Sequence, residues 1–97
     1  MNYTQIDPTY KYDVIADAIY GREMEYFHYD FDLKNFQEII LTLPEGDHKS
    51  QIQGRIDSTL VQMSNVMDIY NALVAQIDDQ VAYDAAVVRA IAKRAAA

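Results

Sequence analysis

The residues of this chain that could hold a metal ion are a glutamate and a histidine three positions apart. Glu25 and His28 have the Glu-x-x-His spacing that supplies ligands to iron pairs inside helical bundles. Such a centre needs two of these motifs and further glutamates, and the second match, Glu45 with His48, lies in a predicted turn. We therefore expect Glu25 and His28 to form a local surface pair, with no cofactor. A ferritin-like metal site that a dimer completes is the alternative.

Groups for other kinds of catalysis are few. The chain has two histidines, no cysteine and no glycine-rich phosphate loop. The usual pairs of nucleophile and base therefore cannot be assembled, and redox chemistry at a thiol is excluded. Adjacent acids such as Asp78 and Asp79 are typical of helix caps rather than of acid–base catalysis. We predict no catalytic residue and no enzyme activity.

An acidic, aromatic segment from Tyr20 to Phe36 is the predicted interaction surface. Six aromatic side chains fall within these 17 residues and are interleaved with four acids. Tyr and Phe give a large contact area, and carboxylates orient a basic partner. A small core with a solvated edge is the alternative. The residues assigned to the surface are Tyr20, Glu23, Glu25, Tyr26, Tyr29, Asp30, Phe31 and Asp32.

The charge of the chain favours a protein partner over nucleic acid. Its net charge is −7, and residues 1–48 hold ten acids against three bases, whereas residues 49–97 hold five of each. An acidic surface repels phosphate backbones and attracts basic protein surfaces, so we expect no direct binding of nucleic acid. Charge that serves only to keep the protein soluble is the alternative.

The apolar residues are numerous but dispersed. They make up 51% of the 97 residues, which is typical of one folded domain, and no run approaches the roughly 18 residues of a membrane span. The N-terminus lacks the basic start and apolar stretch of a secretory signal. We expect a cytoplasmic protein that does not bind membranes.

The elements that must position these residues are predicted to be helices. Pro8 after the capping residue Asp7 indicates a helix start, Asp32 can cap a second helix, and residues 44–46 form a Pro-Glu-Gly turn. Gly21 indicates either a close approach by another helix or a kink. The fold class is therefore all-α, a single domain over residues 1–97 that forms a helical hairpin or small bundle. The predicted helices span about 8–28, 33–43, 48–77 and 80–94, and one bent helix over 8–43 is the alternative to the first two.

The second half carries the most regular pattern, a heptad seam along a long helix. Its members follow each other at alternating steps of four and three residues. Two long antiparallel helices leave their outer apolar stripes exposed, so we expect a homo-oligomer. A monomeric bundle, in which the long helix breaks near Asp78 and folds back, is the alternative. The residues of this predicted seam are Ile56, Leu60, Met63, Met67, Tyr70, Val74, Ile77 and Val81.

The segment AIYGREMEYFHYDFDLKNF, with its Arg-Glu pair and aromatic string, resembles small helical proteins that tailed phages encode. The resemblance covers about a fifth of the chain and carries no functional residue with it. It implies a protein of the host cytoplasm that inhibits a host or defence factor, or a component of virion assembly. We expect the protein to act by binding another protein.

Overall fold

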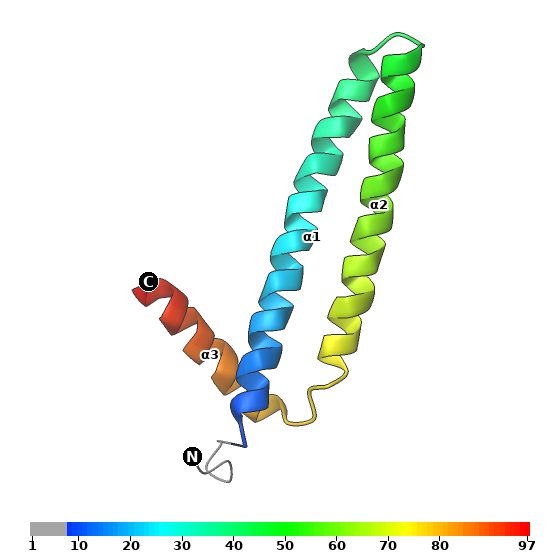
Figure 1. Cartoon of the computed structure of the whole chain (residues 1–97). Helices are drawn as coiled ribbons and strands as arrows, with labels where there is room; N and C mark the ends of the chain where they lie inside the picture. Colours follow the sequence, from blue (N-terminus) through cyan, green and yellow to red (C-terminus); the bar gives the residue numbers. More distant parts are fainter. Residues whose placement is uncertain (1–7) are drawn as a thin grey trace, which may run out of the picture. The chain divides into compact units, whose positions relative to one another are not determined.

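A computed structural model describes residues 8–97, and all regular secondary structure in that range is helical. It consists of α1 (Tyr10–Thr42), α2 (Asp47–Val74) and α3 (Gln80–Ala96), which Figure 1 labels. The predicted all-α fold class is confirmed. The contacts divide the chain into two compact units, which we describe one at a time. Unit 2 is Arg22–Tyr70, and unit 1 combines the described residues up to Gly21 with Asn71–Ala97.

The first helix is longer than predicted. We expected a break between residues 28 and 33, whereas α1 continues through this region without interruption. Two side-chain pairs bridge the expected break: His28 lies 3.4 Å from Asp32, and Lys34 lies 2.8 Å from Asp30. Residues four apart face each other on a helix, so these pairs support the helical conformation. Asp32 therefore pairs within the helix and does not cap a new one, and the alternative of a single helix is the one observed.

The start of α1 and its glycine also differ from expectation. The helix begins at Tyr10, two residues after Pro8, and the expected capping residue Asp7 lies outside the described residues. Gly21 stands inside the helix, and a Cβ added there would meet no atom within 4 Å. The expected close approach by another helix is therefore wrong for the described part of the chain.

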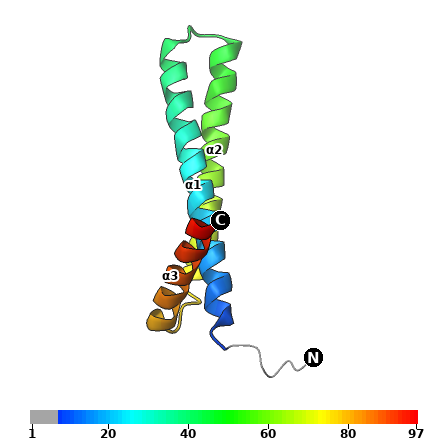
Figure 2. The same cartoon turned by 90° about the vertical axis from the view of Figure 1, so that its left-hand side faces the viewer.

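Unit 2 is an antiparallel helical hairpin. Residues 43–46 connect α1 to α2, and the two helices run side by side in Figures 1 and 2. Gly46 has φ of +149°, which residues with a Cβ rarely adopt, and its carbonyl accepts a hydrogen bond of 3.1 Å from the Ser50 amide. The predicted turn is thus confirmed, and the helix that we expected over about 48–77 is observed as Asp47–Val74.

The core of the hairpin is small. Leu33 from α1 and Ile56 and Met63 from α2 are its buried members. Among residues 8–97 no large side chain is completely buried. A two-layer arrangement covers only one face of each helix, so each helix keeps an exposed side. The partly buried residues that surround this core are Tyr26, Tyr29, Phe36, Ile40 and Ile52.

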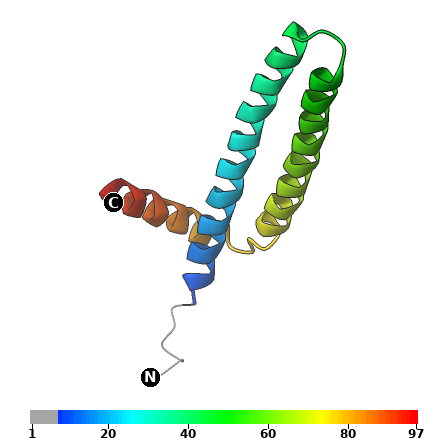
Figure 3. The same cartoon turned by 45° about the horizontal axis from the view of Figure 1, so that its top comes forward.

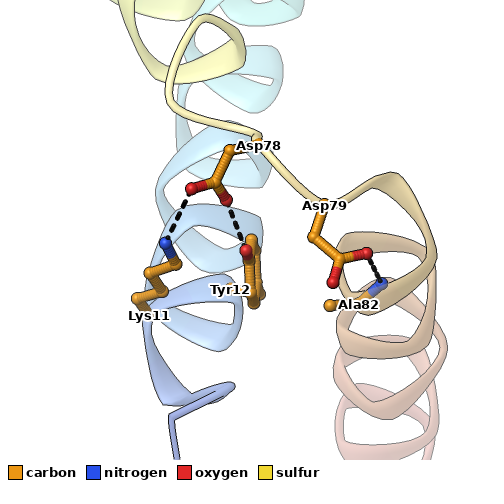
Figure 4. A network of polar contacts seen from close by, with 5 residues as sticks. All are labelled: Lys11, Tyr12, Asp78, Asp79 and Ala82. Atoms are coloured by element: carbon orange, nitrogen blue, oxygen red, sulfur yellow. Dashed lines mark hydrogen bonds and ion pairs between the residues drawn. The ribbon is translucent and has the colours of Figure 1, made fainter.

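In unit 1 the chain turns at residues 75–79 and continues as α3. The Asp79 side chain accepts a hydrogen bond of 3.1 Å from the Ala82 amide, which is the geometry of a helix N-cap (Figure 4). The break near Asp78, which was the alternative to one continuous long helix, is therefore the arrangement observed. Ala86 and Ala90 are buried on α3, and Figures 1 and 3 show α3 beside the first turns of α1.

Polar contacts hold the parts of unit 1 together. Asp78 accepts a hydrogen bond from the Tyr12 hydroxyl and pairs with the Lys11 ammonium at 3.1 Å (Figure 4). The Tyr12 hydrogen bond, followed by the Lys11 pair, lowers the pKa of Asp78, and the same bond to Asp78 raises the pKa of Tyr12. Further along α3, Arg89 lies 2.9 Å from Asp13.

The last turn of α3 makes contacts with α1 through one arginine. The Arg94 guanidinium stacks 3.7 Å from the centre of the Tyr20 ring and lies 3.9 Å from Asp17. A cation above an aromatic face contributes about 0.5–1 kcal/mol at exposed sites.

Of the helices that the structure describes, none combines the length and the apolar character required to span a membrane.

Candidate functional site

The aromatic residues of the predicted interaction surface do not share one side of α1. Tyr26 and Tyr29 pack against the core of unit 2, whereas Phe31 is 64% exposed. Phe27, which lies in the predicted segment but was not among the residues assigned to the surface, is 61% exposed. The fourth predicted aromatic, Tyr20, belongs to unit 1 and lies under Arg94. The segment is therefore part core and part surface.

The acids of the predicted surface are mostly paired with neighbours on the same helix. Glu25 lies 3.1 Å from Arg22, and Asp30 and Asp32 make the pairs with Lys34 and His28 described above. Glu23 is exposed. The hydrogen bond to Asp30 raises the pKa of Lys34. Exposed pairs of this kind contribute about 0–1 kcal/mol each to stability.

Glu25 and His28 do not form the pair that we expected. Glu25 contacts Arg22 and His28 contacts Asp32, so the two motif residues have separate partners. Within residues 8–97 no three histidine or acidic side chains converge as metal ligands would.

The predicted seam along one long helix is wrong beyond Val74, because α2 ends there, Ile77 lies in the connection and Val81 belongs to α3. Its members also differ in exposure. Ile56 and Met63 are buried and Tyr70 and Ile77 half-buried, whereas the alternate members are exposed. The covered stripe continues instead through residues next to those predicted, of which Thr59 and Val66 are buried and Leu73 half-buried. The exposed members of the predicted seam are Leu60, Met67, Val74 and Val81.

A hollow of about 240 Å³ lies on the hairpin between α1 and α2. Tyr26, Val66 and Tyr70 are its less exposed lining residues, and Phe27 and Met67 are its exposed apolar ones. Small-molecule sites usually have about 300–1,000 Å³, so this hollow suits a single side chain of a partner better. Its full lining consists of Arg22, Glu23, Tyr26, Phe27, Val66, Met67 and Tyr70.

Helical spacing extends the apolar surface beyond the hollow. Phe31 follows Phe27 at i+4 on α1, and Leu60 precedes Met67 by seven residues on α2. Both are exposed. Met24 stands three residues before Phe27 and is also exposed. Of these five residues, Phe27 and Met67 line the hollow itself. We call the hollow, together with these two residues and the neighbouring Phe31, the apolar face of unit 2.

The charge around this face is negative. Unit 2 contains nine acids and four bases, which gives it a net charge of −5. A field of this sign attracts basic partners and raises their association rate.

Phe27 and Met24 were not among the residues that we assigned to the surface from the sequence. Their spacing of four and seven residues from Phe31 places them on the same side of a helix, and this spacing could have identified them.

Unit 1 has a wider hollow of about 870 Å³ beside the Asp78 network. Its charged lining residues are Lys11 and Asp78, which are already paired with each other and are largely exposed. Exposed charges that are satisfied by one another offer a ligand little electrostatic gain. The apolar face of unit 2 is therefore the stronger candidate site.

Comparisons of this chain with models of protein families, with curated proteins and with solved structures found no match. The resemblance to phage-encoded helical proteins accordingly stays a prediction. The arguments that follow depend on the geometry and charge of the chain itself.

Proposed function

We propose that this chain is a non-enzymatic helical protein that acts by binding another protein through the apolar face of unit 2. The observation that carries the proposal is the exposure of Phe27 and Phe31, at 61% and 64%, in a hairpin whose described residues include no completely buried large side chain. Exposed contiguous apolar surface on a small protein is typical of an interaction site. Aromatic anchors supply much of the binding energy at such sites.

The charge of unit 2 defines the chemistry of the partner. A segment that presents an apolar side chain to the hollow and basic side chains around it would match both the lining residues and the net charge of −5. An amphipathic basic helix is the simplest such segment. The resemblance to phage-encoded proteins adds a setting, in which the partner is a host or defence factor.

Affinity purification from the native cell tests the proposal when it compares matched variants. Phe27→Ser removes an anchor at the hollow, whereas Leu41→Ser changes an apolar residue that is 85% exposed at the end of α1 and outside the hollow. We expect a protein that co-purifies with the wild type and with Leu41→Ser to be lost with Phe27→Ser.

The identified partner then permits a direct measurement. We expect Phe27→Ser to raise its Kd by about 30-fold, which corresponds to the roughly 2 kcal/mol of an interface hot spot. Circular dichroism should show equal helix content in both variants. A partner that binds Phe27→Ser as tightly as the wild type would contradict the proposal.

A further inference from the structure

Two of the residues that line the hollow of unit 2 are charged, and their charges are opposite. Arg22 and Glu23 are consecutive on α1, and both belong to the wall of the hollow. If both charges were equally available, the hollow would favour neither a basic nor an acidic occupant. Their contacts on α1 decide which of the two charges a partner meets.

Arg22 is already paired within unit 2. Its guanidinium lies 3.1 Å from Oε2 of Glu25, almost one helical turn further along α1. This carboxylate oxygen is shielded from water and accepts no hydrogen bond from the described residues, so Arg22 supplies the positive charge that compensates it. An acid on a partner would have to compete with Glu25 for Arg22 and would therefore gain little from it.

The Glu23 carboxylate, in contrast, is free. Among residues 8–97 no side chain makes an ion pair or hydrogen bond with it, and Glu23 is exposed. Unit 2 contains nine acids, and Glu23 is the one that lines the hollow. The charge that the hollow offers to a partner is therefore negative and is located at this carboxylate.

The spacing on α1 indicates where a partner would carry the matching base. Glu23 and Phe27 are four residues apart, which places them on the same side of the helix, about one turn of 5.4 Å from each other. Residues three or four apart on a partner helix have the same separation. A helix that lies along the hairpin and inserts an apolar residue beside Phe27 therefore brings a residue three or four positions away close to Glu23.

We infer that Glu23 selects the partner, and that the docking segment is a helix with Lys or Arg three or four positions from the apolar residue that enters the hollow. The inference rests on the proposed function, because it specifies the sequence pattern of the occupant of the same surface. A base at that position pairs with Glu23. An acid there is repelled by Glu23 and by the net charge of −5 of unit 2, and Arg22 does not compensate it.

Selection of displayed helical peptides against the full chain tests the inference without knowledge of the natural partner. The library fixes one leucine in an alanine-based helix and varies the positions three and four residues to either side of it. We expect the wild type to enrich Lys and Arg at these positions. With Glu23→Lys as the target, the preference should change to Asp and Glu, because the charge that faces the peptide is reversed.

Glu38→Lys is the matched control. Glu38 is also an exposed glutamate of α1 in unit 2 that has no side-chain partner among the described residues, but it does not line the hollow. It lies about 22 Å from Glu23 along the helix axis, which exceeds the Debye length of about 8 Å at physiological salt. Both substitutions change the net charge equally, so a preference that depends on the summed charge would respond to both. A pair at Glu23 responds to one, and the preference for Lys and Arg should persist in Glu38→Lys.

A selected peptide then gives the magnitude of the effect. Glu23→Gln should raise its Kd by about tenfold, against less than about twofold for Glu38→Gln, and rising salt should reduce this difference. Gln and Glu have similar helix propensities, so circular dichroism should show equal helix content in both variants. Isothermal titration calorimetry measures the Kd values.

The results separate a failure of this inference from a failure of the proposed function. Peptides that Phe27→Ser releases but that lack enriched Lys or Arg would overturn the inference alone, as would a preference that Glu23→Lys leaves unchanged or that Glu38→Lys also reverses. Selected peptides that still bind Phe27→Ser would contradict the proposed function. A dimer of the full chain that Met67→Glu dissociates and Glu23→Lys does not would assign the face to a second copy and overturn the inference, and so would a library from which no peptide is enriched.

Discussion

Two glycines inside helices lower the stability of this fold, and their replacement should raise it. Gly21 lies within α1 and Gly54 within α2, and a Cβ added at either position would meet nothing within 4 Å. An alanine there fits without steric conflict and reduces the conformational freedom of the unfolded chain. Each substitution should therefore raise the free energy of unfolding by roughly 0.5–1 kcal/mol.

The effects of the two substitutions should add. Neither added Cβ has a neighbour in contact, so the sites share no partner, and Gly21→Ala with Gly54→Ala should give about 1–2 kcal/mol together. For a domain of this size, 1 kcal/mol shifts Tm by roughly 4–8 °C. Urea unfolding followed by far-UV circular dichroism measures the change, and an unchanged m value would show that the unfolded state is comparable.

Gly46 supplies the matched control. Its φ of +149° is a conformation that residues with a Cβ rarely adopt, although a Cβ there would also meet nothing within 4 Å. Gly46→Ala should therefore lower the free energy of unfolding by about 1–3 kcal/mol through backbone strain alone. Comparison of the three variants therefore separates the effect of backbone conformation on the free energy of unfolding from the effect of steric contact at the added Cβ.

One pattern of results would refute the reasoning at Gly21. If Gly54→Ala stabilises the protein while Gly21→Ala destabilises it, some group approaches Gly21 closely in solution. A concentration dependence of that loss would identify the group as part of another chain, because only association responds to protein concentration.

Three further substitutions test the two units separately. Asp79→Ala removes the N-cap of α3 and should cost about 1 kcal/mol, seen as a lower urea midpoint, and an unchanged midpoint would mean that the cap is not formed in solution. Met63→Ala leaves a cavity in the core of unit 2 and should cost about 2–5 kcal/mol, against less than about 0.5 kcal/mol for the exposed control Ser64→Ala. The contribution of Asp78 should depend on pH. Its pKa is lowered by the Tyr12 hydroxyl, so its stabilising effect is present above its unfolded pKa of about 4 and is lost as the pH falls through the lowered folded value. Asp78→Asn should therefore reduce the loss of stability in acid, and an acid limb identical to that of the wild type would exclude this role.

Local features of the sequence predicted the helical elements well. The Pro-Glu-Gly turn, the helix start at Asp47 and the break near Asp78 all depend on residues within a few positions of one another. Capping by Asp79 is likewise a short-range interaction with the Ala82 amide. The expected break near residue 30 was wrong because Asp32 has two uses, as a cap and as a partner at i+4, and the sequence does not determine which applies.

Long-range contacts were outside the reach of the sequence. Asp78 contacts Lys11 and Tyr12, which are 67 and 66 residues away, and no spacing rule connects them. Arg94 likewise stacks on Tyr20, a residue that we had assigned to an interaction surface. The division of the aromatic segment into core and surface also depends on where α2 lies, which aromatic content alone does not specify.

The error in the predicted seam has a geometric cause on α2. Two stripes on α2 both contain Ile56 and Met63. One continues through Thr59 and the other through Leu60, and because these two residues are neighbours in the sequence, their side chains are rotated by about 100° around the helix axis. Hydrophobicity favoured Leu60, but the hairpin buries Thr59 and Val66 and leaves Leu60 and Met67 exposed. The two stripes lie on either side of the same buried residues. The single helix α1 that packs against α2 in the hairpin can therefore cover only one of them. The second stripe keeps the heptad spacing that helix packing requires, and the hairpin leaves its members Leu60 and Met67 exposed.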